Sequence, residues 1–224
     1  MLQVVAIDGV SGSGKSSTAR LLAKALGFSH LDTGAMYRMV TFVALQKGLN
    51  PKQTKELGEI AQKIVFSFSE KGELWANGEP LPQQIRSSEV SSMVSEFCKP
   101  SEVRVPLSKQ QRLLGESRPT VVEGRDIASH VFRDAPWKFF LTAKPEIRAI
   151  RRLREMEKAG IPAQYEDILA NLLERDAKDT SRVLNPLLKT ADALEIDTSG
   201  LTLEGQVAML TRLVQASLTV EQVG

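Results

Sequence analysis

The sequence predicts an α/β fold, a doubly wound parallel sheet with a small antiparallel β insert and a helical lid. The first observation is that short β-branched runs alternate with stretches whose apolar residues recur at helical spacing. The second is that the first of these runs, residues 4–7, leads through a glycine-rich turn into a helix. The third is that residues 64–85 break the alternation and favour a hairpin.

The strands and helices of the core can be placed from the same patterns. Buried strands are expected at residues 4–7, 28–31, 120–123, 137–142 and 193–197, and helices at 15–26, 35–46, 146–158, 165–178 and 203–218. Gly27 marks the end of the first helix. Strands that alternate with helices in this way form a parallel sheet covered on both faces.

The stretch from residue 64 to residue 85 is expected to be an insert. Its first residues alternate, Asn77-Gly78 is a hairpin turn signal, and Pro80 and Pro82 exclude a central strand. We therefore expect a core of residues 1–63 and 86–224, with a lid at about 148–182 and an antiparallel lobe at 64–85. A surface hairpin without function is the alternative for this lobe.

Composition excludes several classes of protein. The chain has 224 residues, and 29 Lys and Arg against 27 Asp and Glu leave a formal net charge of +2. This lacks the excess of positive charge that nucleic acid or an anionic membrane surface attracts. A single cysteine, Cys98, excludes an internal disulfide and fits a reducing compartment. We expect a cytoplasmic protein that binds small molecules, without nucleic acid or membrane as a partner.

A phosphate-binding loop is the strongest motif in the chain. Residues 9–16 match G-x-x-x-x-G-K-[ST] in full, between the first predicted strand and its helix. Glycines let successive N–H groups point at phosphate oxygens, Lys15 can reach the β- and γ-phosphates, and the Ser16 hydroxyl can ligate Mg²⁺. This predicts a P-loop NTPase-type sheet that binds a nucleoside triphosphate. The predicted ATP-binding residues are Gly9, Val10, Ser11, Gly12, Ser13, Gly14, Lys15, Ser16 and Ser17.

Polar residues also follow the next predicted strands. Asp32-Thr33-Gly34 follows the strand at 28–31, and residues 123–126 (Glu-Gly-Arg-Asp) end the strand at 120–123. Ligands of doubly wound sheets gather at the carboxyl ends of the strands, so these groups are expected to converge with the P-loop. Arg125 would clamp an anion and Asp126 would accept a hydrogen bond. A helix cap is the alternative role for Asp32 or Asp126.

A third group lies in the predicted lid. Arg175, Asp179 and Arg182 are spaced i, i+4, i+7 and would share one helix face. They form either a solvated face with weak ion pairs or a mobile cover whose arginines close over phosphates. In the second case the upstream arginines at positions 148, 151 and 152 would belong to the same closure.

The kind of acceptor follows from which residues are present. A phosphate acceptor is already anionic, so its kinase needs arginine clamps and no general base. The two histidines, His30 and His130, lie in no catalytic pattern and are expected to be structural. A nucleoside monophosphate is therefore the favoured acceptor. Another small-molecule P-loop kinase is one alternative, and a nucleotide-dependent switch is the other, although no N-K-x-D motif supports a switch.

Four motifs resemble the bacterial cytidylate kinase family, in order along essentially the whole chain. They are the P-loop, residues 31–38 (LDTGAMYR), residues 122–126 (VEGRD) and residues 174–182 (ERDxxDxxR), together with the insert. The resemblance implies that a monomer transfers the γ-phosphoryl of Mg-ATP to CMP or dCMP. Thr33 stands where the family often has serine.

The resemblance also implies roles for individual residues. Those expected to bind CMP are Thr33, Arg38 and Arg125 at the phosphate, Ser95, Arg104 and Asp126 at the cytosine, and Arg175, Asp179 and Arg182 at ribose and phosphates. Lys15, Arg125, Arg175 and Arg182 are the expected catalytic residues. Residues 96–103 match the family poorly, so Ser92 competes with Ser95. Ser16 is the expected Mg²⁺ ligand, and Asp32 is the alternative, which would hold the ion through water.

Overall fold

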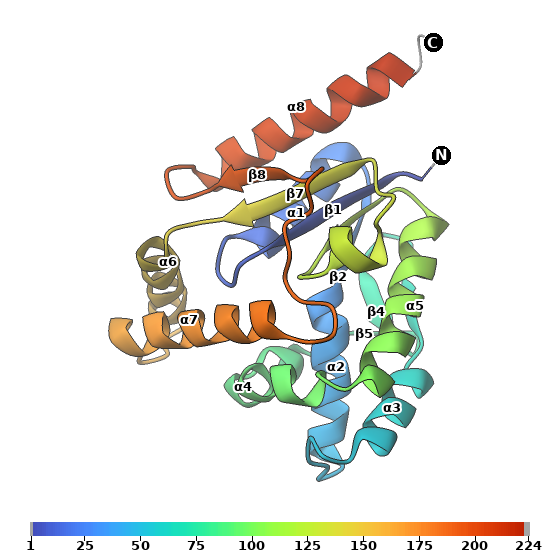
Figure 1. Cartoon of the computed structure of the whole chain (residues 1–224), viewed down its shortest axis with the longest axis vertical. Helices are drawn as coiled ribbons and strands as arrows, with labels where there is room; N and C mark the ends of the chain where they lie inside the picture. Colours follow the sequence, from blue (N-terminus) through green and yellow to red (C-terminus); the bar gives the residue numbers. More distant parts are fainter. Residues whose placement is uncertain (1, 222–224) are drawn as a thin grey trace.

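The structure, a computed structural model, describes residues 2–221. Its centre is a five-stranded parallel sheet in the order β2-β6-β1-β7-β8 (Figure 1). The strands are β1 (Val4–Gly9), β2 (Ser29–Asp32), β6 (Thr120–Glu123), β7 (Trp137–Thr142) and β8 (Leu194–Asp197). All neighbours pair in parallel, with Ile7 opposite Glu123 and Asp32 opposite Glu123, which brings these strand ends together.

Helices cover both faces of this sheet. The α-helices of the described residues are α1 (Lys15–Leu26), α2 (Thr33–Gln46), α3 (Thr54–Lys63), α4 (Ser88–Phe97), α5 (Ser101–Ser117), α6 (Pro145–Lys158), α7 (Tyr165–Ser181) and α8 (Leu203–Glu221). A 3₁₀ helix spans Gln83–Arg86 and a π-helical turn spans Ile127–Val131. The expected α/β fold and each expected core strand and helix are confirmed, with ends shifted by a few residues.

Alternating side chains of β1 build the two halves of the core. Val5 and Ile7 pack in one buried cluster with residues of α1 and α8. Val4 and Ala6 pack in a second, larger cluster with residues of α2, α3 and α5. In Figure 1, α8 lies above the sheet and α2, α3 and α5 lie below it. Because β1 is buried on both faces, the P-loop that follows it starts from a rigid point.

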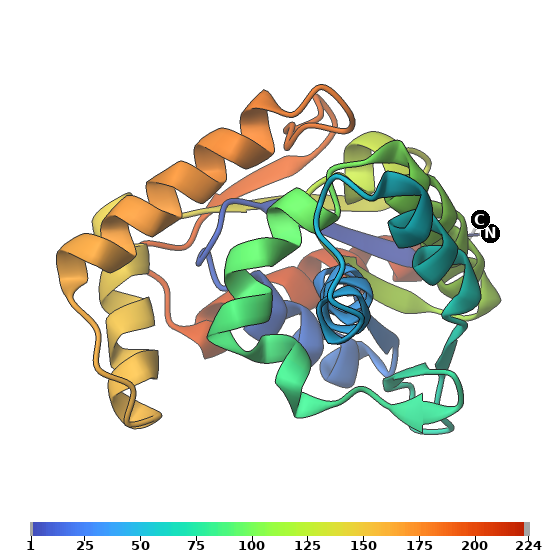
Figure 2. The same ribbon diagram turned by 90° about the horizontal axis from the view of Figure 1, so that it is seen from below.

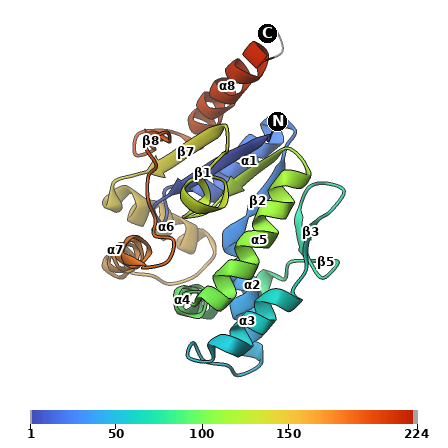
Figure 3. The same cartoon turned by 45° about the vertical axis from the view of Figure 1, so that its right-hand side comes forward.

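The insert forms a small antiparallel sheet of β3 (Phe66–Phe68), β4 (Leu74–Ala76) and β5 (Glu79–Pro80). Asn77 (φ 52°) and Gly78 (φ 80°) make the expected tight turn between β4 and β5. Pro80 lies on the edge strand, which a proline tolerates. Phe66 of the insert belongs to the larger buried cluster, which also contains residues of α3. Figure 3 shows the insert beside α3 and α5.

The helices α6 and α7 form a helical hairpin that extends from the core (Figure 2). They pack on each other through a small buried cluster of their own, centred on Ala149, Ile168 and Leu172. These helices cover most of the segment expected to be a lid. Among the described residues, no helix is both long enough and apolar enough to cross a membrane.

Candidate functional site

The P-loop adopts a conformation that only glycine allows at its first position. Gly9 has φ 148°, and a Cβ there would lie 2.0 Å from the carbonyl oxygen of Leu141 on β7. Gly14 (φ 90°) forms the N-cap of α1. The loop therefore curls directly onto the N-terminal end of α1, where backbone N–H groups favour an anion.

Lys15 is held inside this curl. Its Nζ donates to the carbonyl oxygen of Val10 (2.6 Å) and to Ser13 Oγ (3.4 Å), and the residue is 5% exposed. Burial, followed by the charge of Arg125, holds the pKa of Lys15 well below its usual value. An anion bound in the loop would oppose both effects. The loop thus suits a bound phosphate.

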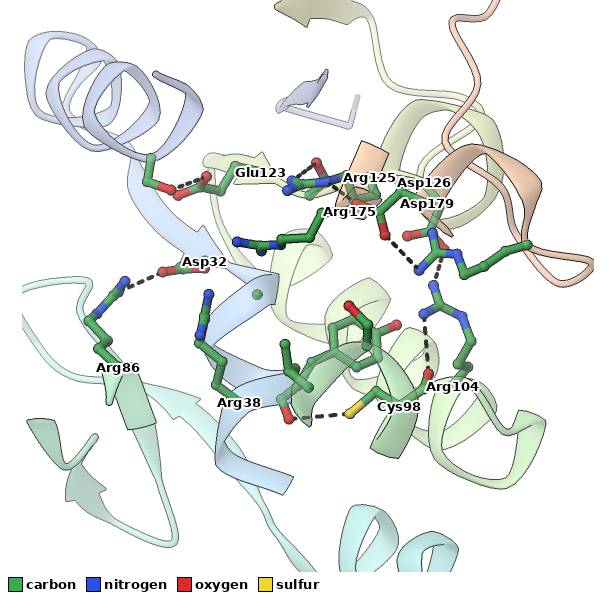
Figure 4. A pocket seen from close by; sticks show the side chains of 17 residues that line it. Asp32, Arg38, Arg86, Cys98, Arg104, Glu123, Arg125, Asp126, Arg175 and Asp179 are labelled. Atoms are coloured by element: carbon green, nitrogen blue, oxygen red, sulfur yellow. Dashed lines mark hydrogen bonds and ion pairs between the residues drawn. The ribbon is translucent and has the colours of Figure 1, made fainter. Parts of the chain in front are cut away.

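A cavity lies next to the P-loop at the carboxyl ends of the strands. Figure 4 shows the side chains of β2, α2, the loop after β6 and α7 converging there. Arginines outnumber carboxylates in the lining. The lining residues are Ser16, Asp32, Gly34, Tyr37, Arg38, Arg86, Val94, Ser95, Cys98, Arg104, Glu123, Gly124, Arg125, Asp126, Arg175, Asp179 and Arg182.

The arginines of this cavity repel one another. Burial is the largest cause that lowers the pKa of Arg38, to about 10, and the charge of Arg175 adds to it. Burial also lowers the pKa of Arg175, with Arg125 as the next cause, and that of Arg182, with Arg104 as the next cause. In Figure 4 the guanidinium groups of Arg38 and Arg175 point into the same part of the cavity. An anionic ligand would relieve this repulsion.

A buried ion pair forms the opposite end of the cavity. Arg104 Nη2 donates to Asp126 Oδ2 at 2.7 Å, and the two side chains are 3% and 4% exposed. The Arg104 guanidinium also lies 5.0 Å from the centre of the Tyr37 ring. Among the described side chains, the Nε atoms of Arg104 and Arg182 are buried donors without a partner. Buried donors of this kind mark places where a ligand acceptor fits.

The lid meets the loop after β6 through a second ion pair. Arg125 Nε donates to Asp179 Oδ2 at 2.8 Å, and Arg182 lies 3.8 Å from the other oxygen of the same carboxylate. These contacts join residues that are 54 positions apart in the chain. The α7 motif therefore closes one wall of the cavity in this structure.

Comparison with known proteins identifies the family. A sequence model of the family described as Cytidylate kinase matches residues 5–216. The cytidylate kinase of Clostridioides difficile (strain 630) is 41% identical over 201 residues, which cover 90% of this chain and 93% of that protein. That of Clostridium tetani (strain Massachusetts / E88) is 39% identical over 222 residues, which cover 99% of this chain and 98% of that protein. The chain belongs to the cytidylate kinase family.

The resemblance of the motifs to the cytidylate kinase family is thereby confirmed.

Among solved structures, an uncharacterized protein from Eubacterium ventriosum ATCC 27560 has a TM-score of 0.52 with 14% identity. The match covers 96% of this chain and 99% of that chain. At this identity the likeness supports the fold alone.

Most residues expected to bind CMP in a cytidylate kinase meet in the cavity. Those that line it are Arg38, Ser95, Arg104, Arg125, Asp126, Arg175, Asp179 and Arg182. Arg182 does so from just beyond α7, which ends at Ser181, so the regular helical spacing does not extend to it. Ser92 is absent from the lining, and its hydroxyl donates to the carbonyl oxygen of Glu89 (2.8 Å).

Thr33 does not join this group. It is absent from the lining of the cavity, and its Oγ1 donates to the carbonyl oxygen of Glu123 at 2.6 Å. The hydroxyl that was expected to hold the acceptor phosphate therefore ties the start of α2 to the end of β6. Thr33 is 2% exposed at the first position of α2.

The three upstream arginines lie outside the lining of the cavity. Arg148 donates to the backbone oxygens of Ala143 (3.0 Å) and Ser11 (2.8 Å), and Arg151 donates to Thr198. Arg152 pairs only with Glu155 on the surface. None of the three lines the cavity. Arg148 and Arg151 attach α6 to the loops of the core.

Asp32 and Arg86 pair in the cavity, where Asp32 was expected from its place at a strand end and Arg86 was not expected. Asp32 caps α2 through the Ala35 N–H (2.9 Å), as its alternative role predicted, and it also binds Arg86 Nη2 (2.7 Å). Arg86 lies beyond the insert and lines the cavity. Its place directly before α4 gave no signal of a partner 54 positions away.

Glu123 lies next to the P-loop, as its place at the end of a strand predicted, but a role as a metal ligand was not predicted for it. Its Oε2 accepts from Ser16 Oγ at 2.7 Å, and its Oε1 lies 3.0 Å from His30 Nε2. It ends β6, a buried strand, at the position where many P-loop proteins carry a metal-binding carboxylate. The signal in the sequence is a glutamate, and not an aspartate, directly after the two valines of the strand. His30 is thus not an isolated core residue but a partner of the site.

Asp8 holds the loop that carries Arg125 and Asp126. This buried carboxylate, on β1, accepts the N–H groups of Ile127 (2.9 Å) and Ala128 (2.8 Å). Burial raises the pKa of Asp8 to about 6, although the two N–H groups act in the opposite direction. The same strand therefore fixes the P-loop at its end and the 124–128 loop at its side.

Asp8 is expected to make stability depend on pH in a measurable way. Because its pKa is higher in the folded chain than in the unfolded one, the folded state binds the proton more tightly, and stability falls as pH rises from about 4 to 6. The raised pKa corresponds to about 3 kcal/mol of unfolding free energy. The unfolding free energy of wild type minus that of Asp8→Asn should therefore fall by this order as pH rises from about 4 to 6. Urea unfolding at pH 4 to 7 measures it, and a constant difference would contradict the role of Asp8.

Proposed function

We propose that this protein is a cytidylate kinase that transfers the γ-phosphoryl group of ATP to CMP or dCMP, giving ADP and CDP or dCDP. The observation that carries the proposal is that Ser16 of the P-loop and the buried Arg104–Asp126 pair line one arginine-rich cavity. The family membership of the chain supports the same conclusion. ATP would bind at the P-loop end of the cavity, and the base of CMP would bind at the Arg104–Asp126 end. The phosphates of the two nucleotides would then face each other.

The donor would bind at the P-loop, residues 9–17. Backbone N–H groups of the loop and the N-terminal end of α1 would hold the β- and γ-phosphates. Lys15 would leave Val10 and Ser13, its present partners, for a phosphate oxygen. This exchange replaces two neutral acceptors by a charged one, which makes a stronger hydrogen bond.

The acceptor would bind in the cavity with its phosphate among Arg38, Arg125 and Arg175. Cytosine presents an amino group that Asp126 can accept, and oxygen and nitrogen acceptors that Arg104 can address. Uracil reverses the donor pattern at two ring positions, so its carbonyl would face the Asp126 carboxylate. Ser95 lines the same cavity and is proposed as a further contact to the base. Asp179 would bind the ribose.

The transfer step needs positioning and charge neutralisation more than it needs a base. The oxygen of the CMP phosphate attacks the γ-phosphorus of ATP, the bond from that phosphorus to the β-γ bridging oxygen breaks, and ADP leaves with the electron pair. Lys15, Arg125, Arg175 and Arg182 would neutralise the charge on the transferred group. The lid would exclude water, which would otherwise compete as the acceptor.

The residues beside the P-loop fit a magnesium ion. The Ser16 hydroxyl and the Glu123 carboxylate lie within hydrogen-bond distance of each other, and Mg²⁺ prefers oxygen ligands of these kinds. These two residues would hold the ion. Bound there, Mg²⁺ would offset the negative charge of the ATP phosphates. His30, hydrogen-bonded to Glu123, keeps that carboxylate oriented.

We also infer that the protein works as a monomer in the cytoplasm. Its near-neutral charge, +2 over 224 residues, gives no broad surface for nucleic acid or for an anionic membrane. The arginines that line one cavity suit small anions instead. Light scattering after size exclusion would test the monomer.

A panel of acceptors tests the proposed function. With Mg-ATP, we expect CMP and dCMP to be phosphorylated at least about 100-fold more efficiently than AMP, because an unpaired buried polar contact costs that much discrimination. The efficiency with UMP is expected to lie between those with CMP and with AMP. A coupled ADP assay measures the rates, with shikimate and a no-acceptor blank in parallel. Equal efficiency with AMP would overturn the assignment to cytosine, and slow ATP hydrolysis without any acceptor activity would favour a switch.

A further inference from the structure

Asp176 connects the lid helix α7 directly to the P-loop. Its Oδ1 accepts the backbone N–H of Ser11, the third residue of the P-loop, at 2.8 Å. Its Oδ2 pairs with Arg148 Nη1 on α6 at 2.5 Å. One carboxylate therefore bridges two lid helices and a loop that lies 165 positions away.

Arg148 completes the junction from the other side. Its Nη1 also donates to the carbonyl oxygen of Ser11 at 2.8 Å, so both polar atoms of the Ser11 backbone are engaged by the lid. The Arg148 side chain is 4% exposed and that of Asp176 is 17% exposed. A Cβ on Gly12 would sit 3.4 Å from both Arg148 and Leu172, so the lid also packs against the loop. The lid and the P-loop are therefore joined by both packing and hydrogen bonds. None of the roles expected for the 174–182 motif was assigned to Asp176.

The position of Asp176 in α7 gives the contact a consequence for the cavity. Arg175 is its neighbour in sequence and Asp179 lies three residues further along, and both line the cavity. Adjacent residues of a helix point about 100° apart, so one can face the P-loop while the other faces the acceptor site. Fixing Asp176 on Ser11 therefore sets both the rotation and the axial position of α7.

We propose that Asp176 is a positioning residue for phosphoryl transfer, which docks α7 on the Ser11 backbone and so places Arg175 and Asp179 over the acceptor. The contact holds α7 and the P-loop in a fixed position relative to each other. This inference rests on the proposed function for its kinetic test, but its structural test needs no substrate. Arg148 is the partner that holds the carboxylate in place.

The kinetic test uses two variants of Asp176 and a matched control. Asp176→Ala should lower kcat by about 10- to 100-fold, the range expected for a lost hydrogen bond to a charged group. Asp176→Asn keeps one acceptor for the Ser11 N–H and should recover part of the loss. Glu174→Gln is the control, because Glu174 lies in the same helix and pairs only with Lys178 on the surface. It should leave kcat within about twofold.

The structural test follows the Ser11 amide itself. Hydrogen exchange at Ser11 should accelerate in Asp176→Ala but not in Glu174→Gln, while the Thr18 amide, which donates to the Gly14 carbonyl oxygen, should exchange as in wild type. Arg148→Lys combined with Asp176→Asn should slow catalysis by less than the product of the single effects. Wild-type kcat in Asp176→Ala, or slow catalysis with unchanged Ser11 exchange, would overturn the proposal. Inactivity of wild type toward every acceptor would instead overturn the proposed function, and the exchange result would stand.

Discussion

Lys15→Met is expected to lower kcat by at least about 10²- to 10³-fold, the cost of removing one preorganised charge from a transition state. Lys15 is the basic side chain inside the P-loop curl, with its Nζ on Val10 and Ser13. CMP should still bind with nearly wild-type affinity, because Lys15 is not among the residues that line the acceptor cavity. Single-turnover kinetics measures the loss, and calorimetric titration with CMP measures the affinity.

The same variant separates activity from stability. Burial lowers the pKa of Lys15, which means that its charge disfavours the folded state. Lys15→Met should therefore unfold at a temperature no lower than wild type while losing catalysis. Lys24→Met on the exposed side of α1 is the control, and both its properties should stay unchanged. Wild-type turnover in Lys15→Met would refute the role of the P-loop lysine.

Asp126→Asn is expected to cost about 3–5 kcal/mol of unfolding free energy, because it leaves the Arg104 guanidinium buried without its counter-charge. It should also lower kcat/KM for CMP by at least about 10²-fold and reduce the preference for CMP over UMP, because the acceptor for the cytosine amino group is weakened. Asp134→Asn is the matched control. Asp134 pairs with Arg112 at a side chain that is 57% exposed, so its loss should cost about 1 kcal/mol or less.

A double replacement distinguishes folding from recognition. Arg104→Met with Asp126→Leu removes both charges and keeps apolar bulk, so most of the stability lost in Asp126→Asn should return. The preference for CMP should not return, since no polar group is left to address the base. Urea unfolding and the ratio of kcat/KM for CMP and UMP provide the two measurements. Recovery of the preference in this double variant would disprove the role of the pair in reading cytosine.

The core of the fold was predictable because its strands and helices differ in hydrophobic period. The run at 4–7 is apolar on both faces, and the next segment has its apolar residues on one helical face. Helix α5 is harder to predict, since Pro106 lies inside it and a proline usually ends a helix. Packing of α5 against α3 and β6 overrides this preference. Tertiary contacts of that kind leave no mark on local sequence.

The candidate site was predictable to the extent that it lies at strand ends. The groups after β1, β2 and β6 meet because the strands are parallel, so their order along the chain was enough. The partner of each side chain was not predictable. Thr33 binds the Glu123 backbone, and Arg148 binds Ser11, 137 positions away. An arginine in a sequence pattern carries no information on whether its partner is a phosphate or a carbonyl oxygen of the chain.

The crowding of arginines in the cavity has a consequence for the lifetime of the protein in a cell. A chain whose binding site repels itself is less stable alone than with its substrate, and a ligand that binds only the folded state raises stability by RT ln(1 + [L]/Kd). At a ligand concentration of 100 Kd this amounts to about 2.7 kcal/mol. The fraction of molecules open to proteolysis would then follow the supply of the nucleotide, so that abundance of the enzyme and availability of its substrate rise together.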